Sequence, residues 1–401
     1  MKRWLSFVAV VVLALALVIG AACGGGGEEE EEGEGVTEIK MGVGLPMLGT
    51  YGAIVGMPAK YAFSMAVEDV GVFTVAGKQY RWKLYFEDNV ASVAGGAASA
   101  TKLIFENNVD FMHQATGSPG LAAESICREK GIILDMSGAN PEHFTPDKPL
   151  FFQIAATWVV QMAPFFDWLV EERPEVQRVA FVVPDDDTGY ALGDGIEACC
   201  DHYGLDVVSP EYTPVAMTEY FPVATKVMSK DPDLFLTTTG AANEAMWDMG
   251  YEGLSATWYW LPSYAEDVGW DRCQGYLIFM PIPLAGLYPE AEAKAAEFED
   301  RYGVECTPAA FWALNVMYVI TDTLMKAGTV DDTAKIVETM ETGSFESLLG
   351  PIYYGGEELN GIGHMSIWPS PLYEVVGENE YRVIDVYTPE ETEAIVNEVF
   401  K

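Results

Sequence analysis

Short apolar runs that alternate with segments of helical spacing restrict the fold of this chain more than any other feature. In the first part of the sequence, we expect strands at residues 39–45, 82–88, 109–114 and 132–136, and helices at residues 61–70, 91–107 and 120–130. Strands that are apolar along their whole length, and that are connected by helices, are typical of a parallel sheet covered on both faces. The segment 77–80 is expected to form the turn before the second strand.

A second series of the same kind begins near Trp158. We expect strands at residues 178–183, 205–209, 234–238, 257–261 and 275–280. Helices are expected between them at 162–172, 190–203, 221–229 and 243–250. Later helices are expected at 289–302, 309–327, 333–341 and 389–400, and short β-like pieces within 352–387. Two such series predict an α/β protein with two doubly wound, parallel-sheet lobes. Ligands of these sheets bind beyond the carboxyl ends of the strands, so we expect the two lobes to face each other across a cleft.

The amino-terminal residues have the layout of an export signal. Two basic residues, an apolar run at 4–19 and three small residues precede Cys23. The apolar run is shorter than the roughly 20 residues that a bilayer span requires. The segment resembles a bacterial lipoprotein signal, in which the cysteine carries the lipid, although Gly20 stands where leucine is usual. We expect a signal peptide at 1–22, a lipidated Cys23 and a flexible Gly- and Glu-rich tether at 23–35; secretion with an unmodified cysteine is the alternative.

Composition limits the size and the partners of the folded part. Half of the residues are hydrophobic, which is enough for a large core, and the length favours two domains. The formal net charge of −39 produces a surface that repels nucleic-acid phosphates and anionic lipid headgroups. Nucleic acid is therefore excluded as a partner.

The cysteines do not form a recognisable framework. Apart from Cys23, there are Cys127, Cys199, Cys200, Cys273 and Cys306. An odd number cannot all pair within the chain, and the adjacent Cys199 and Cys200 are poorly placed to bond each other. A bond between Cys273 and Cys306 is left open. No pair with zinc-ligand spacing occurs, and no motif indicates a cofactor.

Three segments resemble the type I periplasmic solute-binding proteins, specifically the leucine/isoleucine/valine-binding group of ABC importers. They are residues 39–70 (beginning IKMGVGLPMLGTYG), 109–145 (beginning VDFMHQATGSPG) and 178–197 (RVAFVVPDDDTGYALGDGIE). The resemblance extends from Thr37 to Lys401. It implies a protein without catalytic activity that closes on a small solute outside the cytoplasm. The closed form would then dock on a membrane permease that works with an ATPase.

The resemblance also implies how the chain is divided. Lobe one would comprise residues 36–157 plus 283–363, and lobe two residues 158–282 plus 364–401. The chain would cross between the lobes three times, and these crossings would form a hinge for closure.

Two segments after strands of the first lobe are candidates for holding a ligand carboxylate. Thr116, Gly117 and Ser118 lie between a strand and a helix, where backbone N–H groups and a hydroxyl suit an anion. In the family, the matching serine holds the ligand carboxylate; an ordinary N-cap is the alternative for Ser118. The family uses backbone groups after the next strand, which places Gly138 or Ala139 at the ligand unless the segment is an ordinary turn.

Aromatic residues are the second group of candidates. Tyr190 matches the tyrosine that covers the ligand in the family, with packing as the alternative. Tyr51 and Trp158 are placed to line the cleft, where their faces would stack on an apolar or planar solute. Core packing at the hinge is the alternative for Trp158.

One departure from the family pattern concerns the ligand. Amino-acid binders place an acidic residue directly after the strand expected at 257–261, where this chain has Ser263, with Glu266 and Asp267 following. An unpaired ammonium is costly in a closed cleft. Either the loop offers one of the later acids, or the ligand is a small carboxylate, an aromatic acid or an amide rather than an amino acid.

The leading hypothesis is the receptor component of an ABC uptake system, periplasmic or anchored to the membrane by lipid. A sensory protein with the same fold is the alternative, and a secreted hydrolase is a weaker one because Thr116 occupies the first glycine of a GxSxG elbow. The four histidines show no metal spacing. The acidic residues 185–187 are expected to be a solvated helix entrance, although Ca²⁺ would suit them chemically. No GxxxxGK[ST] loop is present, so ATP hydrolysis would belong to a partner.

Overall fold

The structure is a computed structural model that describes residues 35–138 and 140–401. The predicted signal peptide, Cys23, all but the last residue of the tether, and Ala139 lie outside the described residues. Glu38–Lys401 form one compact unit.

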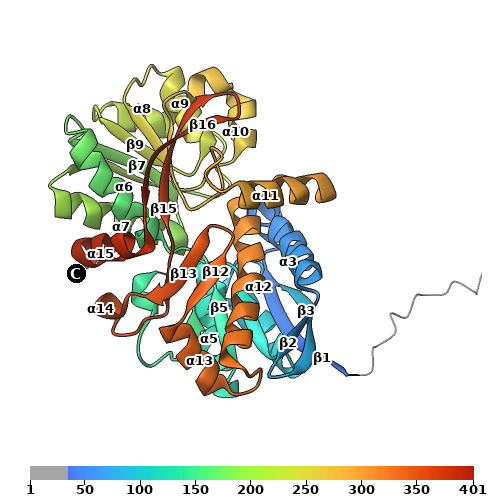
Figure 1. Cartoon of the computed structure of the whole chain (residues 1–401). Helices are drawn as coiled ribbons and strands as arrows, with labels where there is room; N and C mark the ends of the chain where they lie inside the picture. The colour runs from blue at the N-terminus through green and yellow to red at the C-terminus, as the bar shows by residue number, and fades with distance from the viewer. Residues whose placement is uncertain (1–34, 139) are drawn as a thin grey trace, which may run out of the picture. The chain divides into compact units, whose positions relative to one another are not determined.

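The first sheet contains six strands in the order β2-β3-β1-β4-β5-β6 (Figure 1). Its strands are β1 (Val36–Leu45), β2 (Val72–Val75), β3 (Lys78–Asp88), β4 (Phe111–Gln114), β5 (Ile133–Met136) and β6 (Phe151–Phe152). The pairs β1–β4, β4–β5 and β5–β6 are parallel, whereas β2 and β3 form an antiparallel hairpin. The connecting helices are α3 (Met57–Val70), α4 (Val93–Phe105) and α5 (Gly117–Lys130). All residues of β4 and β5 are buried, as expected for inner strands covered on both faces.

The second sheet contains seven strands in the order β16-β15-β11-β10-β9-β7-β8. Five are parallel neighbours: β7 (Arg178–Pro184), β8 (Asp206–Thr213), β9 (Leu234–Thr237), β10 (Leu254–Thr257) and β11 (Leu277–Phe279). The last two, β15 (Ser370–Gly377) and β16 (Glu380–Tyr387), are antiparallel additions. The helices of this part are α6 (Trp158–Glu172), α7 (Asp187–Tyr203), α8 (Phe221–Met228), α9 (Gly240–Asp248), α10 (Pro262–Val268) and α15 (Pro389–Phe400).

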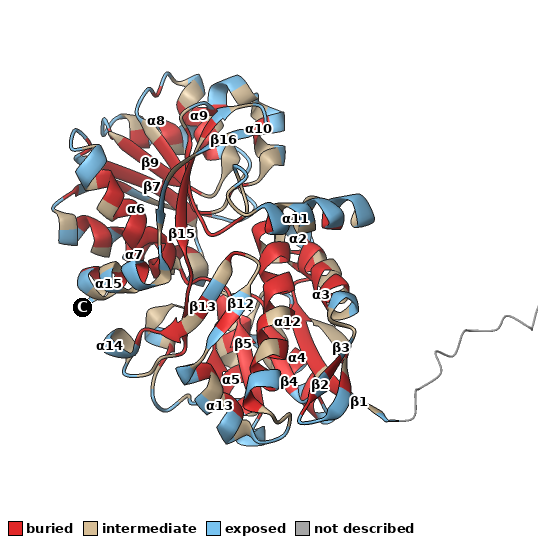
Figure 2. Cartoon of the chain, viewed as in Figure 1, coloured by how far each residue is buried: buried red, intermediate tan, exposed pale blue. Residues whose placement is uncertain are grey.

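The chain passes between the two sheets three times. It leaves the first sheet after β6, leaves the second after β11, and returns to the second at β15. The intervening segment contains α11 (Pro289–Tyr302), α12 (Pro308–Ala327), α13 (Thr333–Thr342) and α14 (Glu357–Asn360), and a small antiparallel sheet of β12 (Ser344–Ser347), β13 (Gly350–Gly355) and β14 (Met365–Ile367). Helix α12 packs against α3 and is buried along most of its length (Figure 2).

The two-sheet α/β fold predicted from the alternating pattern is confirmed, but each sheet is mixed rather than wholly parallel. The turn predicted before the second strand is present but is shorter and earlier than 77–80: it comprises Ala76 and Gly77, because β3 already begins at Lys78 and pairs with β2. The predicted strand at 257–261 is wrong. Strand β10 ends at Thr257, where its pairing with β11 ends, and the aromatic residues that follow belong to a loop at the strand end.

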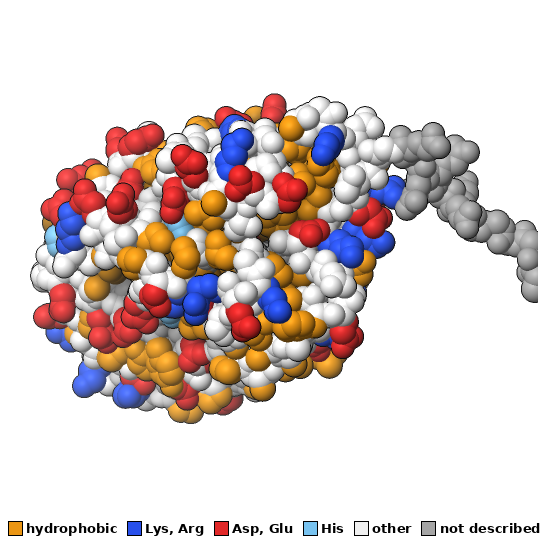
Figure 3. Space-filling model, turned by 90° about the horizontal axis from the view of Figure 1, so that it is seen from below, with side chains coloured by type: hydrophobic (Ala, Val, Ile, Leu, Met, Phe, Trp, Pro, Cys, Tyr) orange, Lys and Arg blue, Asp and Glu red, His pale blue; other side chains and the backbone are white. Residues whose placement is uncertain are grey.

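Three further features concern the cysteines, the surface charge and the helices. The cysteines from Cys127 to Cys306 all carry free thiols, so a bond between Cys273 and Cys306 does not form. The face seen in Figure 3 carries acidic side chains over most of its extent with basic ones among them. Across residues 35–138 and 140–401, no helix combines the length and apolar character that a membrane span requires.

Candidate functional site

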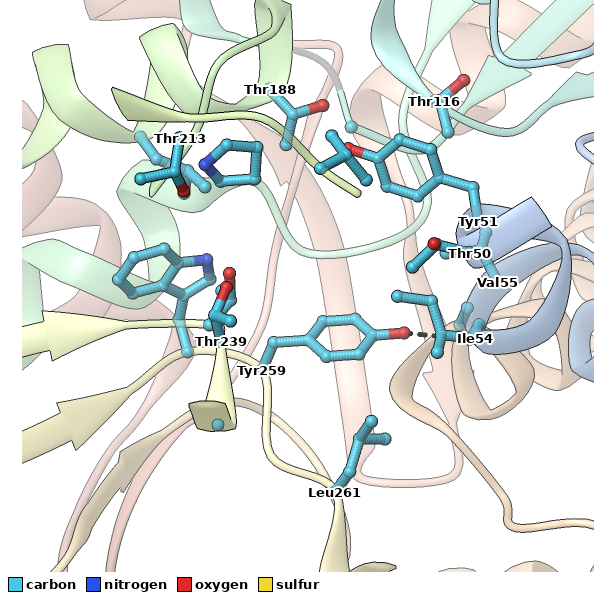
Figure 4. A pocket seen from close by; sticks show the side chains of 18 of the residues that line it. Thr50, Tyr51, Ile54, Val55, Thr116, Thr188, Thr213, Thr239, Tyr259 and Leu261 are labelled. Carbon is cyan, nitrogen blue, oxygen red and sulfur yellow. Dashed lines mark hydrogen bonds between the residues drawn. The ribbon is translucent and has the colours of Figure 1, made fainter. Parts of the chain in front are cut away.

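A cavity of about 570 Å³ lies where loops from both sheets meet (Figure 4). Most of the segments that line it follow the carboxyl ends of parallel strands, which is where ligands bind in sheets of this type. The lining includes Thr50, Tyr51, Ile54 and Val55 after β1; Thr116 after β4; Ser137 and Gly138 after β5; Trp158 at the start of α6; Thr188 in α7; Thr213 at the end of β8 and the residues to Thr218 that follow it; Thr238 to Gly240 after β9; Trp258, Tyr259 and Leu261 after β10; and Ala309 and Trp312 of α12.

The lining is aromatic and rich in hydroxyl groups. Figure 4 shows the threonines at positions 50, 116, 188, 213 and 239 around the cavity, with the rings of Tyr51 and Tyr259 on its wall. No Asp, Glu, Lys, Arg or His is among the described residues that line this cavity. The site can therefore offer hydrogen bonds and aromatic faces, but its own walls contribute no formal charge.

Thr116 has a strained backbone. It precedes α5 with a φ of 71°, which is unusual for a β-branched residue. Such a conformation costs about 1–3 kcal/mol and is found mainly at functional sites. The Thr116 hydroxyl is buried and has no hydrogen-bond partner in the described part of the chain. The strain and the unpaired hydroxyl occur at one residue of the cavity wall.

Gly117 and Gly138 bring two loops close together beside Thr116. A Cβ atom on Gly117 would lie 3.1 Å from the carbonyl oxygen of Gly138. Gly138 itself has a φ of 84°, which favours glycine. The backbone after β4 and the backbone after β5 thus meet at the amino end of α5.

Three hydrogen bonds join the loops of the first sheet to those of the second. The Tyr51 hydroxyl donates to Asp186 Oδ2 at 2.5 Å, and the Tyr259 hydroxyl donates to the carbonyl oxygen of Ile54 at 3.1 Å (Figure 4). The Ser118 hydroxyl donates to Asp187. Burial and the hydrogen bond to Asp186 both raise the pKa of Tyr51, so this phenol remains a donor.

Four of the residues predicted from sequence line the cavity: Thr116, Gly138, Tyr51 and Trp158. Gly117 is buried beside them. Ala139 lies outside the described residues. For Trp158, the position on the cavity wall favours the ligand-facing interpretation over simple core packing.

The other three predicted residues have protein partners instead. Ser118 is paired with Asp187. Tyr190 is 47% exposed, and its hydroxyl donates to Asp185 at 2.5 Å. Ser263 lies on α10 and donates to Glu305 at 2.6 Å. Direct contact of these three with a ligand therefore remains a prediction.

Sequence reasoning missed part of the wall. Trp258 and Tyr259 were assigned to a strand, although an aromatic run at the end of a parallel strand is itself a signal for a site. Trp312 was treated as an ordinary residue of a long helix. The segment from Thr213 to Thr218 carries no pattern that distinguishes it from other loops.

Within the ranges that the structure describes, no group of three or more His, Cys, Asp or Glu residues is arranged to hold a metal ion. The acidic residues Asp185, Asp186 and Asp187 instead form protein contacts. Asp186 caps α7 by accepting from the Gly189 N–H at 3.0 Å, and Asp185 accepts from Tyr190. They therefore serve as a helix entrance with contacts to neighbouring side chains.

The fold has two mostly parallel sheets, three connections between them and a cavity at their strand ends. This arrangement is that of a class of receptors that bind a solute and do not convert it chemically. The periplasmic binding protein family model matches residues 38–368, and the chain belongs to this family of non-enzymatic receptors. No curated protein sequence matches the chain.

Solved structures share the fold at low sequence identity. A leucine binding protein LivK from Thermotoga maritima is 18% identical, with a TM-score of 0.72 over 88% of this chain and 99% of that one. A solute binding protein of an ABC transporter from R. palustris, in complex with 4-hydroxybenzoate, is 18% identical, with a TM-score of 0.74 over 88% and 97%. The LivJ protein from Streptococcus pneumoniae, in complex with isoleucine, is 15% identical, with a TM-score of 0.70 over 88% and 99%. At these identities, the likeness is one of fold.

Proposed function

We propose that this protein is the extracytoplasmic receptor of an ABC uptake system and that it closes two lobes around a small solute carrying a carboxylate. The observation that carries the proposal is the cavity whose wall comes from loops of both sheets, bridged by hydrogen bonds such as Tyr51 to Asp186. A solute bound there would contact both lobes and would stabilise the closed form, which is the form that a permease must distinguish from the empty one.

The solute class is supported by the size and lining of the cavity. A volume of about 570 Å³ accommodates a molecule the size of an amino acid or a substituted benzoate. The printed ligands of the similar structures are isoleucine and 4-hydroxybenzoate, which share a carboxylate attached to an apolar body. The aromatic wall suits such a body, and the amino end of α5 suits the carboxylate.

We further propose that the lobes move about the three connections between the sheets. Lobe one would comprise 36–157 and the segment from 283 onward, and lobe two 158–282 and the carboxyl-terminal segment. Because β14 still pairs with β13, we place the third connection at Trp368 and Pro369 rather than at 363/364. Hydrogen bonds between lobes, such as Ser118 to Asp187, would break when the cleft opens.

The proposed location follows from the amino terminus. Export and lipidation at Cys23 would hold the receptor at the outer face of the cell membrane, with residues 23–35 as a spacer. Metabolic labelling with a fatty acid would test this part, and a Cys23→Ala variant that still incorporates the label would refute it.

A thermal unfolding screen tests the receptor function. Amino acids, aliphatic acids, aromatic acids, amides and polyols are added one at a time at millimolar concentration. A ligand that binds only the folded chain raises the unfolding temperature by mass action, by an amount that grows with its concentration. If no amino acid or organic acid changes the unfolding temperature, the proposal is refuted. Ser118→Ala is expected to lower the affinity for the solute that the screen identifies by about tenfold. The reason is that a hydrogen bond from this hydroxyl to the charged carboxylate of the solute would contribute about 1.5–3 kcal/mol.

A further inference from the structure

We infer that the solute of this receptor is an organic acid without an amino group, whose oxygen atoms accept hydrogen bonds from indole N–H groups of the cavity wall and from the donors beside Thr116. The inference rests on the proposed function and specifies its ligand. Its support comes from three unpaired tryptophan donors, from the absence of charge in the wall, and from the geometry around Thr116.

Three tryptophans of the cavity wall have buried indole N–H groups without an acceptor. They are Trp158, Trp258 and Trp312, and no hydrogen-bond partner for their Nε1 atoms exists within the described chain. Trp258 is fully buried, and Trp312 is 7% exposed. An indole N–H can only donate, and burying it without an acceptor is destabilising. Three such groups around one cavity indicate that a bound molecule supplies the acceptors.

Three described tryptophans that do not line the cavity, Trp82, Trp260 and Trp368, have acceptors for their indole N–H groups. The Trp82 indole donates to the Thr321 hydroxyl at 2.8 Å. The Trp368 indole donates to the carbonyl oxygen of Ile154 at 2.8 Å. Among the described residues, the buried indole nitrogens that lack an acceptor are those of the three cavity tryptophans.

The described wall of the cavity offers no carboxylate to a ligand ammonium, and Asp186, Asp187 and Glu305 outside it already accept hydrogen bonds from the protein. Among the described residues, none of the cavity wall is acidic. Asp186 contacts Tyr51 of the wall, but its two oxygens accept from Tyr51 and from the Gly189 N–H. Glu305 accepts from the hydroxyl and the backbone N–H of Ser263. A buried ammonium without a paired charge is strongly disfavoured, so an α-amino acid fits this wall poorly.

A small cavity adjoins the wall and contains one titratable residue. His113 lines it together with Ser137 and Trp312, both of which also face the main cavity. The His113 Nδ1 lies 2.6 Å from Asp135 Oδ2, and both side chains are buried. This carboxylate also accepts from the Ile154 N–H at 2.8 Å, and Asp135 is not among the described residues that line either cavity.

The backbone around Thr116 supplies a place for the carboxylate. Helix α5 begins at Gly117, and its first N–H groups have no partner within the helix. The unpaired Thr116 hydroxyl and the loop at Gly138 lie beside this helix end. Neutral donors of this kind stabilise an anion at the amino end of a helix without a cationic side chain.

Matched pairs of solutes test the inference directly. Isothermal titration of the full chain uses 3-phenylpropanoate against phenylalanine and 4-methylpentanoate against leucine, with benzoate, 4-hydroxybenzoate and glycine betaine alongside. We expect at least one acid to bind and its α-amino counterpart to bind at least about 30-fold more weakly. Equal or tighter binding of phenylalanine or leucine overturns the inference while leaving the receptor function intact. Exclusive binding of glycine betaine, which would use the aromatic faces, has the same consequence. If no solute of any class binds, the proposed function fails as well.

Tryptophan variants test which groups hold the acid. Trp312→Phe and Trp258→Phe keep an aromatic ring but remove the N–H. Each is expected to lower the affinity for the acid by about 5–20-fold. Trp82→Phe is the matched control, because it removes a paired indole outside the cavity, and it should change the affinity by less than about twofold. Unchanged affinity in both cavity variants overturns the assignment of the donors.

A measurement on the unaltered chain covers the case in which a variant does not fold. With ¹⁵N-labelled tryptophan, the indole N–H signals of the cavity residues should move downfield when the acid is added, because each gains an acceptor. The signal of Trp82 should stay in place. If the acid binds and no indole signal moves, the inference is wrong.

Discussion

Replacing Tyr51 with phenylalanine tests whether hydrogen bonds between the two sheets stabilise the closed form. The variant keeps the ring on the cavity wall and removes only the hydroxyl that donates to Asp186 at 2.5 Å. A hydrogen bond to a charged acceptor contributes about 1.5–3 kcal/mol. Asp186 is only half-buried and water can replace the lost donor, so we take the lower end, about 1.5 kcal/mol. This corresponds to about tenfold weaker binding of the solute that the screen identifies.

A double-mutant cycle separates this bond from other effects of the substitution. Asp186→Asn retains an acceptor for the Gly189 N–H and therefore preserves the cap of α7. If the bond is the cause, Tyr51→Phe should cost much less in the Asp186→Asn background than in the unaltered chain, as measured by titration calorimetry. Additive losses, or a loss below about twofold for Tyr51→Phe alone, would refute the reasoning.

The remaining predictions concern stability and reactivity. Burial raises the pKa of Tyr381 to about 12, whereas an unfolded tyrosine loses its proton near pH 10. The unfolded chain therefore ionises first at this residue, and the unfolding temperature should fall as the pH rises from about 10 to 12; a constant unfolding temperature over this range would contradict the burial of Tyr381. Burial raises the pKa of the Cys273 thiol to about 11 and that of the Cys127 thiol to about 12. Iodoacetamide should therefore label these two cysteines at pH 8 only after denaturation, and rapid labelling of the native chain would contradict their burial. In Gly96→Ala, the new Cβ would lie 2.3 Å from the Cα of Pro119. This clash should lower the free energy of unfolding by about 1–3 kcal/mol, as measured by urea titration. An unchanged urea midpoint would show that α4 and α5 can move apart without cost.

The sheets were predictable because their strands are buried on both faces. A strand such as Leu234–Thr237, with the sequence LFLT, is too short to be a helix and too apolar to be a loop. The error at 257–261 has a physical cause, because Trp, Tyr and Thr favour strands locally while the pairing of β10 ends at Thr257. The antiparallel direction of β15 depends on contacts with β11 far away in sequence, which no local pattern contains.

The candidate site was predictable only where it follows a strand directly. Thr116, Gly138 and Tyr51 were found in this way, because the loop after each parallel strand faces the cavity. Ser263 was placed by counting from a strand whose end was misassigned, and the structure positions it beside Glu305. Trp312 reaches the wall through α12, whose path across the first sheet is a property of tertiary packing.

The late strands β15 and β16 have a consequence for the order in which the chain can fold. Leu277 of β11 pairs with Glu374 of β15, and α15 packs against α6, so the second sheet is closed by the carboxyl-terminal residues. While the chain is synthesised from its amino terminus, β11 is an unpaired edge strand until these residues have been added. Pairing over such sequence separations is slow, since the ends of a long loop must meet first. The seven-stranded sheet is therefore complete only after the residues of β15, β16 and α15 have been synthesised. Until then, the unpaired edge of β11 must be protected from pairing with other chains.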